Sequence, residues 1–445
     1  MFPGAWRVPP ARGSRYGATE LFLRTATLGP TLLALCACGP AAPTYYQQVK
    51  PILDSRCITC HTAGAIAPFA LDSYPSAKAR AQAAASATAA GLMPPWRAGA
   101  ADVTYLYNPS LTDDQKATLA AWAKAGAPEG DKARPGADLP KLAGGIQRVD
   151  LTLAMQQPYA PTLSPDDYRC FPLVWPETTP VFVTGFDALP GVTAMVHHVA
   201  LYLVPPDSAQ APFQWDAEDT APGYSCFGGP FGNRPQEFAV NLLTAWIPGT
   251  QGVTFPRNGG VPVPPGATVV IQMHYNTAAS LQPDQSSFQF QLASSVDRQM
   301  VYQPFLDPGW VAGQMNIPAG ATNVPFLYQA DPRDFFSLLG STLDTTNGFN
   351  IEAVMFHMHK LGAEGQLWLE RPDHTHVKVL DISNWDFHWQ LQYSLETPVR
   401  FQPGDQLRLK CVFDNSPGRI STVKDVNWGE GSEDEMCVAN ILSSR

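Results

Sequence analysis

Charged residues are scarce in this chain of 445 residues: Asp, Glu, Lys and Arg make up 15%, and the net charge is −10. There is no basic patch with interleaved aromatic residues, which argues against a nucleic-acid-binding protein. No short-period repeat is found, and the N-terminal apolar run, residues 28–37, is too short to span a bilayer. Hydrophobic residues nevertheless make up 45% of the chain, so the sequence is not that of a disordered protein.

Proline and glycine are abundant, with 43 and 35 residues, and they recur between short apolar runs. This pattern is typical of many short strands, such as 199–204, 267–274, 366–370 and 406–413. The chain is too long for one ordinary core, and roughly 300 residues of strands exceed one sandwich. We therefore predict a mainly β fold with two tandem antiparallel β-sandwiches, residues 147–300 and 301–445, after a linker at 131–146.

The N-terminus has the features of an export signal. Four arginines, the last being Arg24, precede the apolar run. The run ends in Leu35-Cys36-Ala37-Cys38-Gly39, which resembles a bacterial lipoprotein cleavage box with Cys38 as the lipidated residue. The alternative is an ordinary signal peptide cleaved near Ala42. In either case we expect an exported, periplasmic or cell-surface protein, and with Cys38 lipidated it would touch the membrane only through that lipid anchor.

A c-type haem attachment pattern follows the signal, at Cys57-Ile58-Thr59-Cys60-His61. The two thiols would add to the porphyrin vinyl groups, and His61 would be the proximal iron ligand. A zinc site needs further ligands nearby, but the next histidine is His197. Met93 is the predicted sixth ligand, because it is the only methionine between Met1 and Met155; the alternative for Met93 is a core methionine.

Residues 44–130 are rich in alanine and helix formers. The spacing of Leu119, Trp122 and Ala123 predicts an amphipathic helix over 113–125, with Thr112 as its N-cap. Together with the haem motif and Met93-Pro-Pro-Trp96, the segment resembles the small class-I-like cytochrome c domains of bacterial multidomain redox proteins. The resemblance implies a small all-α domain with one covalently attached haem c.

Four cysteines remain after those of the signal and the haem motif: Cys170, Cys226, Cys411 and Cys437. Four cysteines allow three pairings, and oxidised pairs are the default in an exported protein. The local pairing, Cys170–Cys226 and Cys411–Cys437, is favoured because each pair falls within one half of the strand-rich region.

Five histidines are clustered in three predicted strands, as the pair His197-His198, as His274, and as His357-Met-His359. Residues two apart on a strand face the same way, so His357 and His359 can share a metal. By the same rule Gln272 can support the ring of His274. Adjacent histidines need a bulge or a twisted strand end, with different ring nitrogens, before they can share one metal. A lone strand histidine is usually a satisfied surface or core residue, but this clustering favours a metal site, and a thioether ligand would favour copper.

Residues 147–445 resemble the type II copper, ascorbate-dependent monooxygenases, the family of the peptidylglycine α-hydroxylating and dopamine β-monooxygenases. The resemblance is carried by Val196-His-His-Val199, Gln272-Met-His-Tyr275, His357-Met-His359, Asp414-Asn-Ser-Pro417, Trp428-Gly-Glu-Gly and Asp434-Glu-Met-Cys437. It implies an electron-storing copper on His197, His198 and His274, an O2-activating copper on His357, His359 and Met436, and jelly-roll-like domains. It also implies that the Cys411–Cys437 bond pins the strand that carries Met436.

The predicted function is hydroxylation of a C–H bond of a small organic substrate with O2. Electrons would enter through the c-type haem or from ascorbate, with an ascorbate-like molecule or a redox protein as donor, and we expect the haem to reduce the copper of His197. A non-catalytic exported copper and haem lipoprotein, or an electron-transfer protein, is the alternative. Intact ligands at all six positions favour the enzyme.

Two positions depart from the family pattern. Where the peptide hydroxylases hold a substrate carboxylate with arginine and tyrosine, this chain has Met355 and Asn440. An apolar or neutral substrate is therefore expected. We predict that His374 and His376 are exposed hairpin residues and that His388 is structural.

Overall fold

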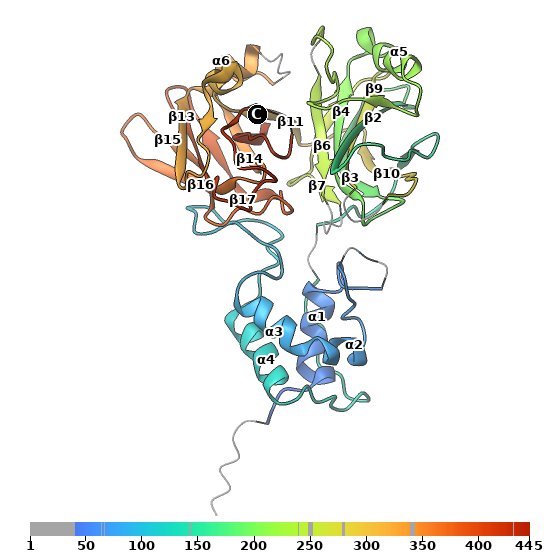
Figure 1. Cartoon of the computed structure of the whole chain (residues 1–445), viewed down its shortest axis with the longest axis vertical. Helices are drawn as coiled ribbons and strands as arrows, with labels where there is room; N and C mark the ends of the chain where they lie inside the picture. The colour runs from blue at the N-terminus through green and yellow to red at the C-terminus, as the bar shows by residue number, and fades with distance from the viewer. Residues whose placement is uncertain are drawn as a thin grey trace, which may run out of the picture. The chain divides into compact units, whose positions relative to one another are not determined.

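The computed structural model describes residues 41–445 except 64, 66, 142, 143, 239, 248–251, 278–280, 339–342 and 430. The predicted export signal, with Cys38, lies outside the described residues. The described residues are mainly β, as predicted, with strands β1 to β20 and six short α-helices (Figure 1). None of the described helices is long and apolar enough to cross a membrane.

The helical segment comes first in the described chain, and its core is formed by side chains such as Leu53, Leu119 and Trp122. Its elements are the π-helical turn η1 (Tyr45–Val49), α1 (Lys50–Arg56), α2 (Tyr74–Ala79), α3 (Ala81–Ala89) and α4 (Asp113–Lys124). The predicted helix 113–125 is confirmed within one residue. Thr112 accepts from the backbone N–H of Gln115 while the Gln115 side chain accepts from the Thr112 N–H, so both N-terminal donors are satisfied.

The segment 97–107, between α3 and α4, runs beside the second half of the strand-rich region. Gly99 donates its backbone N–H to the carbonyl of Asp381, and Tyr105 forms a β-bridge with Leu395. Arg97 forms an ion pair with Asp386 at 2.8 Å. The predicted linker 131–146 contains no helix or strand among its described residues.

One hydrophobic core lies between a five-stranded sheet and the first strands of a nine-stranded sheet. The five-stranded sheet has the order β5 (Tyr224–Ser225), β2 (Asp166–Val174), β9 (Thr268–Asn276), β4 (Val196–Val204), β6 (Asn241–Trp246). The facing strands are β1 (Leu151–Ala154), β10 (Ser287–Ala293), β3 (Val181–Leu189) and β8 (Gly259–Val263), with β7 (Val253–Thr254) paired to β3. Helix α5 (Ala211–Glu218) and the 3-10 turn η2 (Pro206–Ser208) lie between β4 and β5 in the chain.

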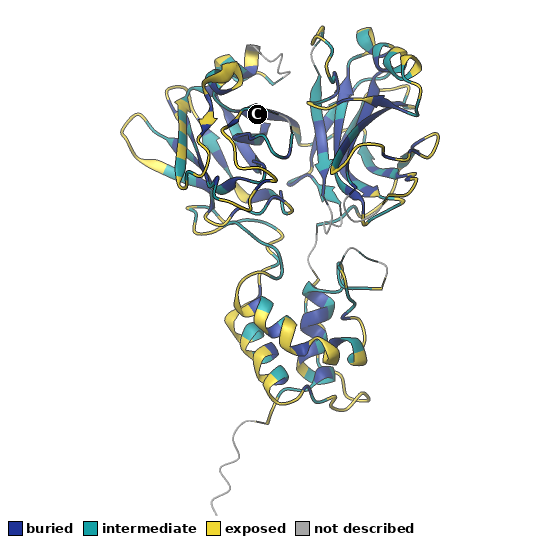
Figure 2. Ribbon diagram, viewed as in Figure 1, coloured by how far each residue is buried: buried dark blue, intermediate teal, exposed yellow. Residues whose placement is uncertain are grey.

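A second core lies between the remaining strands of the nine-stranded sheet and a four-stranded sheet. The nine-stranded sheet continues with β11 (Arg298–Phe305), β20 (Val438–Ser444), β14 (Phe349–His357) and β17 (Gln392–Phe401). The four-stranded sheet has the order β13 (Val324–Ala330), β18 (Gln406–Phe413), β15 (Gly362–Glu370), β16 (His376–Ile382). The smaller elements are η3 (Trp310–Gln314), α6 (Pro332–Leu338) and the pair β12 (Asn316–Ile317) and β19 (Val426–Asn427). Figure 2 shows that the buried residues follow the strands and the exposed ones the loops.

Strand β11 belongs to both cores. Met300 and Tyr302 are part of the first core and Phe305 is part of the second. Successive side chains of a strand point to opposite faces, so one strand can supply both. The predicted division near residue 300 falls within this strand, and β11 pairs with β8 on one side and β20 on the other.

Two disulfides, Cys170–Cys226 and Cys411–Cys437, confirm the predicted pairing, with Cα–Cα distances of 5.7 and 6.0 Å. The first joins β2 to the residue after β5. The second joins β18 to the residue before β20. Cys411–Cys437 lies in the second core, and Cys170–Cys226 lies in a separate small buried cluster, so each bond stays within one half of the strand-rich region.

Candidate active site

Three imidazole rings converge at one end of the five-stranded sheet. The Nδ1 atoms of His197 and His198 are 3.3 Å apart, and each lies 3.2 Å from Nδ1 of His274. A point equidistant from three nitrogens about 3.2 Å apart lies about 1.9 Å from each (3.2 Å divided by √3), close to the 2.0–2.1 Å of a metal–imidazole bond. The three residues therefore form a group that fits one metal ion.

A β-bulge brings the adjacent histidines to the same side. The register of β4 against β9 shifts between Val196 and His198, so that His198 pairs with His274. In a regular strand His197 and His198 would face opposite ways, and the extra residue of a bulge re-aims one side chain. This agrees with the bulge expected from the sequence, but the expectation of different ring nitrogens is wrong, because His197 and His198 both present Nδ1.

Asp166 orients the ring of His274. Nε2 of His274 donates to Oδ1 of Asp166 at 3.0 Å, which leaves Nδ1 with its lone pair, and Tyr168 stacks on the same ring at 4.1 Å. The expected role of Gln272 is wrong: its amide donates to the carbonyl of Cys226 at 2.9 Å. Gln272 faces the same side of β9 as His274, but its amide donates to the backbone carbonyl of Cys226 and not to the imidazole.

A second pair of imidazoles lies at the end of β14. The Nε2 atoms of His357 and His359 are 3.2 Å apart. The other nitrogens have partners: Nδ1 of His357 lies 2.5 Å from Oε1 of Gln390, and Nδ1 of His359 lies 3.1 Å from the carbonyl of Asp434. Because both partners are acceptors, each Nδ1 carries the proton and each Nε2 keeps its lone pair for a metal.

Met436 is buried and lines the same cavity as this pair. Its neighbour Glu435 is fully buried, and its carboxylate accepts from the backbone N–H groups of His359 (2.8 Å), Leu361 (2.5 Å) and Met436 (3.2 Å). Burial raises the pKa of Glu435 to about 8, against the lowering effect of these N–H donors. Glu435 thus ties the turn after β14 to the chain that carries the thioether.

Burial keeps all five imidazoles neutral. It lowers the pKa of His197 and of His359 to about 3, and it also lowers the pKa values of His198, His274 and His357. A metal needs the unprotonated ring as its ligand. The two groups are therefore ready to bind metal at neutral pH.

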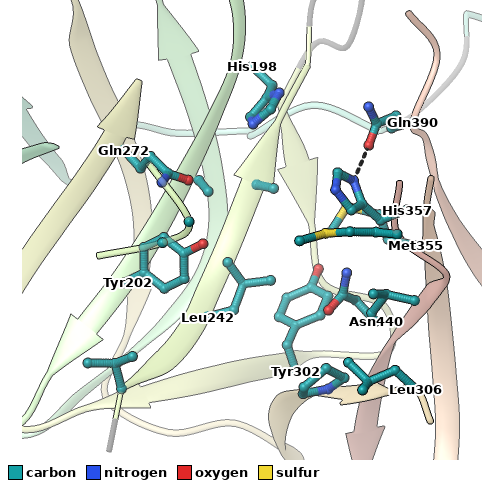
Figure 3. Close-up of a pocket in the computed structure, with 18 of the residues that line it drawn as sticks. His198, Tyr202, Leu242, Gln272, Tyr302, Leu306, Met355, His357, Gln390 and Asn440 are labelled. Atoms are coloured by element: carbon teal, nitrogen blue, oxygen red, sulfur yellow. Dashed lines mark hydrogen bonds between the residues drawn. The ribbon is translucent and has the colours of Figure 1, made fainter. Parts of the chain in front are cut away.

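Both groups open onto one cavity of about 410 Å³ (Figure 3). Its lining includes His198 from the first group and His357, His359 and Met436 from the second. A volume of this order suits a small organic molecule. A substrate in this cavity would therefore lie beside His357, His359 and Met436, with His198 of the first group at the edge of the cavity.

The haem motif lies directly after α1. Nδ1 of His61 lies 3.0 Å from the carbonyl oxygen of Phe69, so Nδ1 donates and Nε2 is left as an acceptor. Cys57 and Cys60 are half-buried and belong to neither disulfide. Burial raises the pKa of the Cys57 thiol to about 12. Two uncharged thiols beside an oriented imidazole are a donor set that fits covalent haem attachment.

The chain around Met93 comes near this motif. Pro94, Pro95 and Trp96, which follow Met93, line a pocket together with Thr59 and Cys60. Met93 itself is half-buried. The proximity is what an iron ligand in this segment requires.

Besides His61, three histidines lie outside both groups. His374 and His376 are exposed, one in a turn and one at the start of β16, as predicted for hairpin residues. His388 is also exposed; its ring lies 6.0 Å from that of His197, and its Nδ1 donates to Oδ1 of Asp386 at 3.0 Å. Its neighbour Phe387 stacks on His197 at 4.9 Å.

Sequence reasoning missed three residues that orient the imidazoles: Asp166, Gln390 and Glu435. Glu435 has a signal, since it directly precedes Met436 in the Asp434-Glu-Met-Cys437 motif. Asp166 and Gln390 are distant in sequence from the histidines they contact, so no local pattern marks them.

Comparisons with known proteins agree with these observations. A family model described as copper type II ascorbate-dependent monooxygenase, C-terminal domain, matches residues 339–442. The chain is 26% identical over 264 residues to a tyramine beta-hydroxylase of Caenorhabditis briggsae, covering 57% of this chain and 40% of that protein. It is 26% identical over 217 residues to MOXD1 homolog 2 of Drosophila melanogaster, covering 45% of this chain and 27% of that protein.

The chain therefore spans less than half the length of either relative. The matched model covers His357, His359 and Met436. Among solved structures, the crystal structure of the STIV MCP covers 60% of this chain at 13% identity, with a TM-score of 0.21.

Proposed function

We propose that this member of the copper type II ascorbate-dependent monooxygenase family hydroxylates a C–H bond of a small organic substrate with O2. The observation that carries the proposal is the opening of two groups of neutral, oriented imidazoles onto one cavity. The overall reaction consumes a C–H bond, O2, two electrons and two protons, and it yields an alcohol and water.

The residues divide into two roles. His197, His198 and His274 would hold an electron-storing copper, and their three Nδ1 atoms support a site without a position for substrate. His357, His359 and Met436 would hold the second copper, where two imidazoles and a thioether leave a position open and favour Cu(I). Bound at these sites, the two copper ions would supply one electron each and activate O2. We also assign the two cores to the two sandwich domains of the family.

The remaining groups orient these ligands and shield them from water. Asp166 and Gln390 hold the rings of His274 and His357, and partners of this kind raise ligand basicity and fix the tautomer. No acid–base pair is needed at the carbon that reacts. The protein's contribution is to place a C–H bond beside His357 and Met436 and to keep bulk water away from it.

We further propose that residues 44–130 form a cytochrome c-like domain with a haem bound to Cys57, Cys60 and His61 and with Met93 as sixth ligand. The hydrogen bond from His61 to Phe69 supports this. The haem would pass electrons from ascorbate or a redox protein to the copper of His197. Export by the N-terminal signal, with Cys38 as a lipid anchor at the bacterial cell envelope, completes the proposal.

A direct test is O2 uptake by the copper-loaded protein with candidate substrates, with products identified by mass. Met436→Ala should abolish O2-dependent product while leaving most copper bound. Metal analysis should give about two copper ions and one haem iron per chain, from the ligand groups described. Unchanged product formation in Met436→Ala would contradict the assigned oxygen site.

Electron entry has its own test. The double variant Cys57→Ala/Cys60→Ala should lose the spectrum of covalent haem and keep both coppers. If the variant is still reduced rapidly by ascorbate and turns over fully, the haem is not the route of entry.

A further inference from the structure

The cavity between the two groups of histidines has no charged side chain in its lining. The described residues that line it include carboxamides, phenols, imidazoles and apolar side chains, and none is Asp, Glu, Lys or Arg. The proposed function does not specify the substrate. The side chains that line the cavity restrict which substrates can bind there.

One wall of the cavity is apolar and amide-bearing. Met355 on β14 lies opposite Asn440 on β20, and both line the cavity. Tyr302 of β11 is on the same wall, where its hydroxyl donates to Oε1 of Gln392. Figure 3 shows these three labelled side chains grouped near His357.

The facing wall comes from the five-stranded sheet. Leu242 on β6 and Tyr202 on β4 point into the cavity, and Gln272 lies beside them (Figure 3). The amide of Gln272 already donates to the carbonyl of Cys226. This wall therefore offers a flat apolar surface with a phenol and an amide at its edge.

We infer that the substrate is an uncharged small molecule with a hydroxyl, carbonyl or amide group, and that ionised amines and carboxylates are rejected. An ionised group that leaves water needs an opposite charge or several hydrogen bonds, and the lining residues provide no opposite charge. A neutral polar group can pair with the carboxamide of Asn440, which both donates and accepts. The inference rests on the proposed function, because it assigns this cavity to the substrate.

The two neutral residues Met355 and Asn440 lie where a charged group of the substrate would otherwise be bound. Met355 is two residues before His357 on β14, so its side chain and the His357 ring face the same side of the sheet. A charged substrate group at Met355 and Asn440 would lie near the second group of histidines but without an oppositely charged side chain among the described lining residues. Exchanging Asn440 for a charged residue should therefore change which ions are accepted.

The test uses three probes that share a phenyl ring and a benzylic CH2: 2-phenylethanol, 2-phenylethylamine and phenylacetate. Their binding to the copper-loaded full chain is measured by calorimetry without reductant, so that no turnover occurs. We expect the alcohol to bind more tightly than the amine and the acid by on the order of 100-fold. If no uncharged probe binds more tightly than its charged counterparts, the inference is overturned.

Two variants test whether the preference for the uncharged probe comes from the side chains that line the cavity. Asn440→Asp should raise the affinity for the amine, and Met355→Arg should raise that for the acid, each by at least about 10-fold. Asn440→Leu is the matched control and should raise neither. A gain of affinity for both ions in the control would contradict this assignment.

The proposed function fails in a different way. Suppose that 2-phenylethanol or a related neutral molecule binds tightly but gives no product that depends on Met436. This result would contradict the proposed hydroxylation, but not the inference that the cavity binds uncharged molecules. If an ionised amine or acid is hydroxylated with the same kcat/KM as the alcohol, the inference about the substrate is contradicted, but the proposed hydroxylation is not.

Discussion

Asp166 and Ser432 are hydrogen-bonded through their side chains although 266 positions separate them. Asp166 also accepts from Nε2 of His274. Ser432 lies in the loop that leads to Met436. One carboxylate therefore contacts both a ligand of the first group and the loop that carries the thioether of the second.

Replacing Asp166 by Asn should weaken metal binding by the first group. The amide keeps the shape but loses the charge that orients His274, and loss of such a partner typically lowers metal affinity about 10- to 100-fold. Copper titration against a competing chelator measures the change. Ser432→Ala is the control: it removes the bond to the loop, keeps the bond to His274, and should leave the affinity of the first group within about a factor of three.

Glu435→Gln tests the anchor of the thioether. The amide NH2 cannot accept, so at least one of the N–H groups of His359, Leu361 and Met436 loses its partner. We expect the free energy of unfolding to fall by about 1–3 kcal/mol. X-ray absorption of the Cu(I) protein should show weaker sulfur scattering.

The neighbouring Glu433→Gln provides the control, because Glu433 is partly exposed and hydrogen-bonded to Ser421. Its effect on unfolding should stay within about 0.5 kcal/mol. Equal losses in both variants would show that Glu435 has no special role.

The two disulfides allow a paired comparison. Removing Cys411–Cys437 by a double serine substitution should cost about 2–5 kcal/mol and loosen Met436, the residue before Cys437. Removing Cys170–Cys226 should cost a similar amount but leave sulfur ligation unchanged, because that bond lies in a separate buried cluster with Val204 and Tyr224. Loss of the sulfur signal in both double variants would refute this division.

The pH dependence follows from the buried imidazoles. Burial lowers the pKa of His197 and of His359 to about 3, whereas an unfolded histidine has a pKa of about 6.5. Below about pH 6.5 the unfolded chain takes up protons that the folded, metal-free chain does not, so the free energy of unfolding falls as the pH falls. Above that pH these rings impose no such cost.

Thermal unfolding of the metal-free protein at about pH 7 and about pH 5 measures this. The melting temperature should be lower at the acidic pH, and copper should remain bound there because protons do not compete for buried nitrogens. Release of copper near pH 6.5, the titration of an ordinary histidine, would contradict the effect of burial.

The sequence predicted well wherever the signal is local. The helix at 113–124 follows from its capping residues and apolar spacing, and the strands follow from alternation between turn residues. The bulge at His197 follows from two adjacent histidines that face one metal. The local disulfide pairing and the exposed His374 and His376 were predicted by the same kind of reasoning. These features depend on neighbours in the chain, whose geometry the backbone period determines.

The partners of the imidazoles could not be predicted. Gln272 was expected to hold His274, and Asp166 does so, because the choice depends on which acceptor another strand brings within 3 Å. Gln390 and His357 are 33 positions apart and meet through a loop. Residue type and spacing carry no signal for such contacts.

By itself the sequence determined the residue types at the candidate site, the two disulfide pairs and the mainly β class, because each rests on short-range periodicity or on counting. Only the tertiary structure decided that β11 serves two cores, which ring nitrogen of His274, His357 and His359 is free for a metal, and that the described residues lining the cavity carry no charged side chain. Those properties arise from side chains that the sheets bring together from distant parts of the chain, and their energies depend on burial and on partners.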